Sequence, residues 1–235
     1  MSGAKDKNIY VKKIEKIRDY NVWLVDGQYV RKVINENFVE YDHHYNHSFV
    51  PKRELWIDEE TNPEERKFFI NHMFVEMGLI KVGEGYDEAV KKADFFEKKE
   101  REAENNKNHF RAPKNRKELL ETVRKKILEE SGEKIKIWLV DGKLVRDFFL
   151  VEYAEGGHDK VYSFIPKNEI WIDEVLSPEE RKFIILHELR ERFLMSLGKK
   201  YSEAHKSATL VEDYYRDHED KLEERIKEEI QNSDK

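Results

Sequence analysis

The chain has 235 residues, 40% of them charged, with a formal net charge of −6 at pH 7 and no cysteine. The lack of cysteine excludes disulfides, iron–sulfur clusters and cysteine-ligated zinc, so His, Asp and Glu are the only strong metal ligands left. Acidic and basic residues are mixed along the chain, which argues against a nucleic-acid partner. The bias toward Lys and Glu without Cys is typical of thermophiles, and we expect a thermophilic source.

The sequence also bears on location. Residues 1–16 contain no apolar stretch of the kind found in a signal peptide. The longest uninterrupted apolar runs, such as FIIL at 183–186, are too short to span a bilayer. We therefore expect a cytoplasmic protein without a membrane partner.

The strongest pattern in the sequence is an internal repeat. VWLVDG at 22–27 matches IWLVDG at 137–142, a displacement of 115 residues from Trp23 to Trp138. The register continues without a gap, so that SFVPKRELWIDEE matches SFIPKNEIWIDEV and NPEERKFFI matches SPEERKFII. Such a repeat indicates two copies of one small domain. We predict a first repeat at 8–105, a linker at 106–120, a second repeat at 121–222 and a charged tail at 223–235.

Each copy is predicted to begin with strands. Asp26-Gly27 and Asp141-Gly142 stand between apolar, β-branched segments, as in two-residue hairpin turns. Aromatic and β-branched residues then predict two more short strands per copy. These are SFVP and ELWID in the first copy and VYSFIP and EIWID in the second.

A helical hairpin is predicted after the strands. Asn62-Pro63 and Ser177-Pro178 each supply an N-cap and a proline at the first helical position. The first helices should end near Gly83 and Gly198, and the second should start near Tyr86 and Tyr201. The predicted fold class is therefore α+β, a tandem duplication in which each copy is a small antiparallel sheet followed by a two-helix hairpin. The tail is expected to be a helix extension or a frayed end, and the copies are expected to form a pseudo-dimer or a homo-oligomer.

The helix that contains FIILHELRERFLM, residues 183–195, places ionisable side chains on its apolar face. Phe183, His187, Glu191 and Leu194 recur at steps of four, four and three, which puts all of them on one side of a helix. The His and the Glu should therefore be partly desolvated. Because an unpaired buried carboxylate is costly, Glu191 requires an arginine, a histidine or a metal ion as its partner.

Comparison of the two copies places the fuller set of such residues in the second. At the displacement of 115 residues, the first copy has Met73 in place of Glu188 and Val90 in place of His205. We therefore regard the site of the first copy as degenerate. The pairs that match are His72 with His187, Glu76 with Glu191, Glu97 with Glu212, and His43 with His158.

The segment His187-Glu188-Leu189-Arg190-Glu191 resembles the HExxH helix of zincin-type metallopeptidases, with Glu191 where that motif has its second histidine. The resemblance implies that His187 and Glu191 bind zinc and that His205 or Glu212 supplies a third ligand. It also implies that Glu188 is the general base that activates water, in the hydrolysis of a peptide or amide bond. His158, in a loop after two glycines, could reach the same pocket.

Other interpretations fit the same residues. His187 and Glu191 could be a buried hydrogen-bonded pair in a non-catalytic tandem-repeat binding or scaffold protein. Glu188 could be a solvated ion-pair partner of Arg192. The histidines of residues 43–47 could bind a metal, although an exposed polar loop is the simpler interpretation. A dinuclear iron or manganese centre shared by the copies is a further possibility, built from His72, Glu76, Glu97, His187, Glu191 and Glu212.

Overall fold

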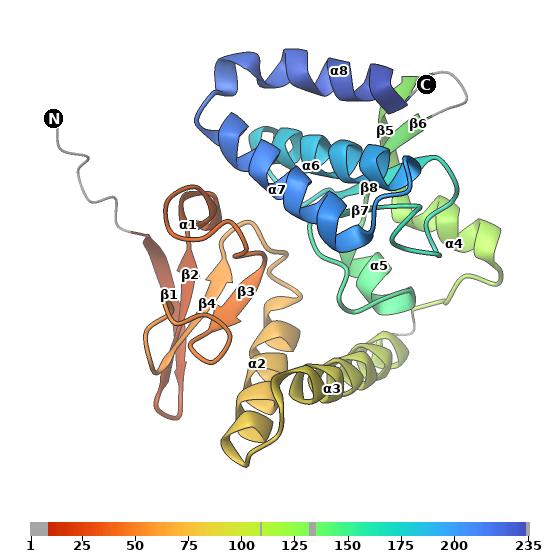
Figure 1. Cartoon of the computed structure of the whole chain (residues 1–235). Helices are drawn as coiled ribbons and strands as arrows, with labels where there is room; N and C mark the ends of the chain where they lie inside the picture. Colours follow the sequence, from red (N-terminus) through yellow and green to blue (C-terminus); the bar gives the residue numbers. More distant parts are fainter. Residues whose placement is uncertain (1–8, 109, 132–134, 234–235) are drawn as a thin grey trace, which may run out of the picture. The chain divides into compact units, whose positions relative to one another are not determined.

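The computed structural model describes residues 9–108, 110–131 and 135–233. The chain separates into two compact units, the first ending at Asn105 and the second beginning at Asn106. Each unit contains a four-stranded sheet followed by helices (Figure 1), so the predicted α+β duplication is confirmed.

From the first strand to the second long helix, the two units have the same order of elements, and the helix α4 precedes the first strand in the second unit only. The first unit contains β1 (Tyr10–Ile17), β2 (Tyr20–Val25), α1 (Gly27–Val33), β3 (Tyr41–His43), β4 (Glu54–Asp58), α2 (Arg66–Lys81) and α3 (Tyr86–Lys107). The second unit contains α4 (Arg116–Val123), β5 (Arg124–Ser131), β6 (Ile135–Val140), α5 (Gly142–Phe148), β7 (Gly156–His158), β8 (Glu169–Asp173), α6 (Pro178–Ser196), α7 (Tyr201–Arg216), the short 3₁₀ helix η1 (Glu219–Lys221) and α8 (Leu222–Ser233).

The sheets are mixed rather than antiparallel, which corrects one part of the predicted fold. Their strand orders are β1-β2-β4-β3 and β5-β6-β8-β7. The outer pairs are antiparallel, but the central pairs, β2 with β4 and β6 with β8, are parallel. The chain leaves β2 through α1 and β3 before β4 returns beside it, and such a crossover makes the two neighbours parallel.

The Asp-Gly pairs cap helices and are not hairpin turns. The carboxylate of Asp26 accepts a hydrogen bond from the backbone N–H of Tyr29 at 2.9 Å and so caps α1. Gly27 is needed because a Cβ atom there would lie 1.7 Å from a carboxylate oxygen of Asp58. Asp141-Gly142 has the same role at the start of α5. The hairpin between β1 and β2 turns instead at residues 18–19.

Two of the predicted strands are turns. SFVP and VYSFIP lie in segments where Val50 donates its N–H to the carbonyl of His47, and Ile165 donates to that of Tyr162. The third strand of each sheet is the shorter β3 or β7, which ends in a histidine, while the predicted strands at ELWID and EIWID are β4 and β8.

The helical hairpins follow the prediction closely. Ser177 is the N-cap of α6, and Gly83 and Gly198 have φ angles of +96° and +87° just after α2 and α6. Both second helices begin at the predicted tyrosines. One start differs: α2 begins at Arg66, because residues 63–65 form a turn.

The segments outside the repeat are more ordered than predicted. The helix α4 begins inside the predicted linker and continues into β5. The charged tail is the helix α8, which buries Leu222 and Ile226 in the core of the second unit. The carboxyl group of Glu229 is also buried and contacts Arg225 and Arg190. Residues 223–233 of the predicted tail are therefore part of the fold and not a frayed end, and residues 234–235 lie outside the described residues.

Each sheet is covered on both faces, as the second unit illustrates. Ile170 and Ile172 of β8 pack with Leu186 of α6, whereas Trp171 faces Val145 of α5 on the other side.

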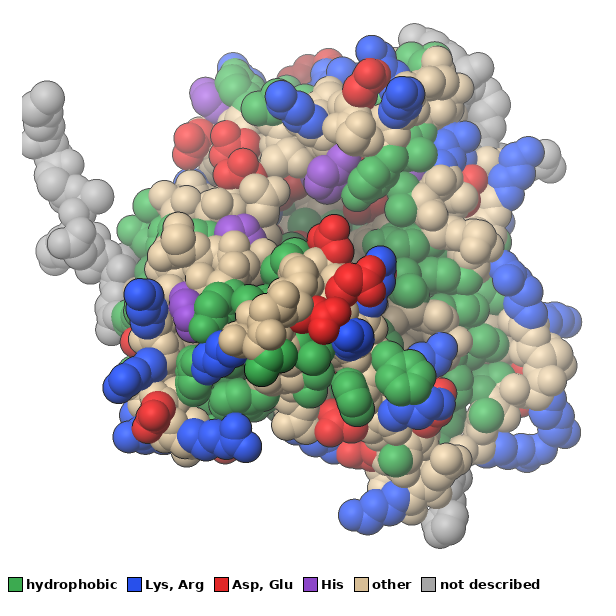
Figure 2. All heavy atoms as spheres, turned by 60° about the horizontal axis from the view of Figure 1, so that its bottom comes forward, with side chains coloured by type: hydrophobic (Ala, Val, Ile, Leu, Met, Phe, Trp, Pro, Cys, Tyr) green, Lys and Arg blue, Asp and Glu red, His purple; other side chains and the backbone are tan. Residues whose placement is uncertain are grey.

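None of the described helices has the length and apolar character needed to cross a bilayer. Acidic and basic side chains both occur over the face drawn in Figure 2, and histidines reach that surface in several places.

Candidate metal site

The predicted site residues lie on three elements of the second unit. His187 and Glu191 come from α6, His205 and Glu212 from α7, and His158 is the last residue of β7 at the edge of the sheet. The positive φ of the glycine after α6 lets the chain reverse, so that α7 packs against α6. The five residues form one connected network of contacts.

Glu191 is the centre of this network. One carboxylate oxygen, Oε1, lies 3.0 Å from Nε2 of His158. The other, Oε2, lies 2.7 Å from Nδ1 of His205 and 3.6 Å from Nε2 of His187. Burial by itself would raise the pKa of Glu191, but the contacts with the three imidazoles hold it far below its usual range. Glu191 is therefore an ionised carboxylate whose side chain is only 4% exposed.

His187 uses both ring nitrogens. Its Nδ1 lies 2.8 Å from Oε2 of Glu212, and its Nε2 lies 3.2 Å from Nδ1 of His205. Burial lowers the pKa of His187, but the carboxylates of Glu191 and Glu212 outweigh burial and raise the pKa to about 10. At neutral pH this position therefore attracts positive charge, which either a proton or a metal ion can supply.

Three atoms have the spacing of metal ligands. Nε2 of His187, Oε2 of Glu191 and Nδ1 of His205 are separated by 3.6, 3.2 and 2.7 Å. A tetrahedral zinc ion with ligands at 2.0–2.1 Å separates them by about 3.3 Å. The triangle could therefore close around one ion with small movements of the side chains.

Glu212 occupies a supporting position. Its carboxylate meets the nitrogen of His187 that points away from the triangle, and it also accepts hydrogen bonds from Arg216 at 3.0 and 2.7 Å. Arg216 in turn contacts Glu180 at 2.6 and 3.0 Å. A carboxylate on the far nitrogen of a ligating histidine fixes the tautomer and the orientation of the ring. The geometry thus favours His205 over Glu212 as a third ligand.

His158 is held as a hydrogen-bond donor. Its Nδ1 accepts the backbone N–H of Lys160 at 3.1 Å, so in a neutral ring the proton is on Nε2, which faces Glu191. A nitrogen that carries a proton cannot coordinate a metal. His158, Glu188 and Glu191 also have ligand atoms within 4.8 Å of one another, but the hydrogen bond from Lys160 disfavours an ion among them.

Glu188 lies beside the triangle in a half-buried position. Burial raises the pKa of its carboxyl group above the usual value, against the opposing effect of the nearby histidines. It is not the ion-pair partner of Arg192, whose guanidinium contacts Asp159 at 2.6 Å. That alternative interpretation of Glu188 is therefore wrong. A carboxyl group with a raised pKa beside a bound water is suited to proton transfer near neutral pH.

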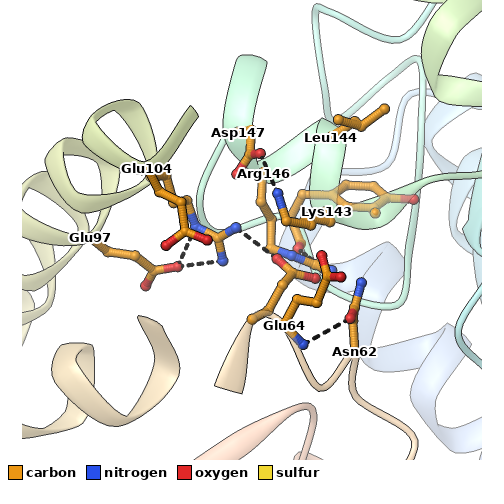
Figure 3. Close-up of polar contacts among 12 residues, drawn as sticks. Asn62, Glu64, Glu97, Glu104, Lys143, Leu144, Arg146 and Asp147 are labelled. Atoms are coloured by element: carbon orange, nitrogen blue, oxygen red, sulfur yellow. Dashed lines mark hydrogen bonds and ion pairs between the residues drawn. The ribbon is translucent and has the colours of Figure 1, made fainter. Parts of the chain in front are cut away.

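The first unit keeps the buried His–Glu and Glu–Arg contacts, which we call the frame, but it lacks the triangle of ligand atoms. His43 lies 3.3 Å from Glu76, and His72 lies 2.9 Å from Glu97. Glu97, labelled in Figure 3, also contacts Arg101 at 2.7 and 2.8 Å. Met73 and Val90 replace Glu188 and His205. Among the described residues, both clusters with metal-ligand spacing lie in the second unit.

The histidine-rich loop of the first unit differs from the prediction. His43 is 1% exposed and faces Glu76, so it belongs to the buried frame. His47 pairs with the buried Asp42. The interpretation of residues 43–47 as an exposed polar loop is therefore wrong for these histidines.

Several residues of the network were not predicted. Arg101 and Glu65 match Arg216 and Glu180 at the repeat displacement, so a search for identical charged residues in the two copies would have found them. Asp159, Arg192 and Asn168 have chemically different counterparts in the first copy, and the repeat gives no signal for them.

No protein-family model matches the chain, and the comparisons with curated proteins and with solved structures found no match. We therefore infer a function from the geometry of the second unit.

Proposed function

We propose that the protein is a metal-dependent hydrolase that acts from its second unit, with zinc bound by His187, Glu191 and His205. The observation that carries the proposal is the spacing of 3.6, 3.2 and 2.7 Å among one atom of each residue. Three protein ligands leave a fourth tetrahedral position for water, as in catalytic zinc sites. The chemistry agrees with the resemblance of the helix to the zincin motif.

The neighbouring carboxyl group gives this water a proton acceptor. Zinc lowers the pKa of bound water to about 7, and Glu188, which has a carboxylate oxygen within 4.8 Å of an oxygen of Glu191, would accept the proton. The resulting hydroxide would attack a peptide or amide carbonyl, the substrate class that the zincin resemblance implies. His205 is 43% exposed, so a substrate can approach from the side of α7.

Iron(II) or manganese(II) is the alternative metal. Two imidazoles and one carboxylate are also the ligand set of many mononuclear iron sites. The metal identified in the protein decides between zinc and these ions.

A second candidate function has one observation in its favour. The first unit keeps the contacts of His43, His72, Glu76 and Glu97 although it lacks the triangle. This retention favours a purely structural role for the same frame in both units, in a non-catalytic tandem-repeat binding or scaffold protein.

Elemental analysis of protein purified without added metal separates the two candidates. The hydrolase proposal expects about one zinc per chain, lost in H187A and kept in H72A, which is the matched control in the first unit. Circular dichroism should show that both variants are folded. Metal-free protein whose melting temperature does not change in chelator would contradict the proposal.

A further inference from the structure

The residue after Glu191 forms a contact that the first unit lacks. Nε of Arg192 donates to Oδ1 of Asp159 at 2.6 Å, and one terminal nitrogen donates to the side-chain oxygen of Asn168 at 3.0 Å. The other oxygen of Asp159 accepts the backbone N–H of Asn168 at 3.0 Å. We call these three residues the clamp. It ties α6 to the segments that follow β7 and precede β8.

The clamp is adjacent in sequence to the hydrogen bond that orients Glu191. Asp159 follows His158, and Arg192 follows Glu191. His158 and Glu191 are the two ends of the 3.0 Å contact between the edge strand and α6. The clamp therefore fixes the backbone on both sides of that contact.

The first unit holds its equivalent histidine in another way. Met77 occupies the position of Arg192, is 1% exposed and packs in the apolar core. The carboxylate of Asp42 contacts the backbone N–H of His43 and the side chains of Asn46 and His47. These contacts are local to the loop and do not include α2.

Stability is a poor explanation for the clamp. The side chains of Arg192 and Asp159 are 7% and 8% exposed. The free energy needed to desolvate two such charges is about as large as the free energy gained from their electrostatic attraction. A methionine at this position is compatible with the fold, as Met77 demonstrates. We therefore look for a role of the clamp other than stability, one that a methionine could not fulfil.

We infer that Arg192 and Asp159 are positioning residues for the metal site. They hold His158 against Oε1 of Glu191, so that Oε2 keeps its direction toward His187 and His205. This inference depends on the proposed metal site and adds the residues that set its affinity. Loss of such supporting contacts typically weakens metal binding by about 10- to 100-fold.

The test compares zinc affinity, measured by competition with a chelating dye, in wild type and in R192M/D159N. The double variant removes both charges together, so neither is left buried alone. We expect zinc binding to weaken by about 10- to 100-fold, with the melting temperature of the metal-free protein unchanged or higher. The visible spectrum of the cobalt-loaded variant should also change, because the carboxylate ligand is no longer fixed.

The matched control is K143M/D147N, which removes an ion pair of 2.9 Å within α5 (Figure 3). This variant should bind zinc as tightly as wild type. Should R192M/D159N fail to fold, R192K keeps the charge but loses the forked contact with two partners, and it should still weaken zinc binding.

Unchanged zinc affinity and cobalt spectrum in the clamp variant, with wild type binding zinc, would overturn the clamp inference alone. A wild-type protein that binds no zinc would overturn the proposed function and the clamp together.

Discussion

The two units share one buried polar frame, yet the second gains the features of a metal site through a few replacements. Both units place a histidine of the edge strand against a glutamate of the first long helix, and both support the helix histidine with a glutamate and an arginine. In the second unit, His205 and Glu188 replace Val90 and Met73. The contacts of the frame compensate the buried charges in both units. The two replacements add a possible third metal ligand and a possible general base in the second unit only.

The largest expected effect comes from the central carboxylates. E191Q leaves buried imidazoles without their anion, and breaking such a buried pair costs about 3–5 kcal/mol. The matched variant E76Q should cost less in the first unit, where Glu76 lies 3.3 Å from His43 and 3.7 Å from His72. Chemical denaturation of the metal-free proteins measures both, and only E191Q should also abolish zinc binding. Equal zinc binding by E191Q and E76Q would contradict the proposal that only the second unit binds zinc.

The pH dependence of metal-free stability should follow His187. Its pKa is raised from 6.5 to about 10 in the folded protein. The stabilisation is therefore complete below pH 6.5 and is lost as the pH rises toward 10, by on the order of a few kcal/mol. Denaturation curves between pH 6 and 10 should show this loss in wild type and a smaller loss in H187N. If wild type and H187N lost the same free energy of unfolding between pH 6 and 10, His187 would not be protonated in the folded, metal-free protein.

Zinc binding should show the opposite dependence on pH over the same range. Zinc must displace the proton from Nε2 of His187, so its affinity should rise as the pH increases from 6 to 8. Calorimetric titrations in two buffers of different ionisation enthalpy would count the protons released. Proton release that stays the same in H187N would argue against this residue as a ligand.

The first unit should gain metal binding when it receives the groups that it lacks. V90H/M73E supplies the two missing groups beside His72 and Glu76, whose nitrogen and oxygen are 3.7 Å apart, close to the 3.6 Å of the second unit. We expect a second, weaker zinc site. Free zinc at 100 times the Kd of this site would add about 2.7 kcal/mol to the free energy of unfolding. A stoichiometry that stays at one zinc would show that the two replacements are insufficient.

The smallest expected effect concerns Tyr153, which replaces Phe38 of the first unit. Its hydroxyl is buried and makes no hydrogen bond with the described residues. Y153F should therefore raise the free energy of unfolding by about 1 kcal/mol. Thermal denaturation would measure the gain, and a loss of stability would show that the hydroxyl has a partner, such as a bound water.

Local signals predicted the helices well but the sheet less well. The cap at Ser177 and the glycines at 83 and 198 act within one turn of the chain, so the sequence specifies them directly. The parallel pairing of β2 with β4 depends on a crossover that no short pattern encodes. Asp-Gly suits both a hairpin turn and a helix cap, so the pair alone does not distinguish the two structures.

The repeat predicted the histidines and glutamates of the frame, since identical pairs at one displacement mark a shared environment. It could not reveal Arg192 or Asp159, whose counterparts are the apolar Met77 and a histidine. Nor could it show that His158 is a donor, because that follows from the backbone N–H of Lys160. Contacts of this kind depend on tertiary structure.

If His205 completes a metal site that the first unit lacks, H205V should remove the site and keep the fold, because Val90 shows that the fold accepts valine at this position. Zinc bound per chain should be counted in wild type and in H205V after equilibrium dialysis. We expect one zinc in wild type and none in the folded variant. Equal amounts of zinc in the two proteins would contradict it.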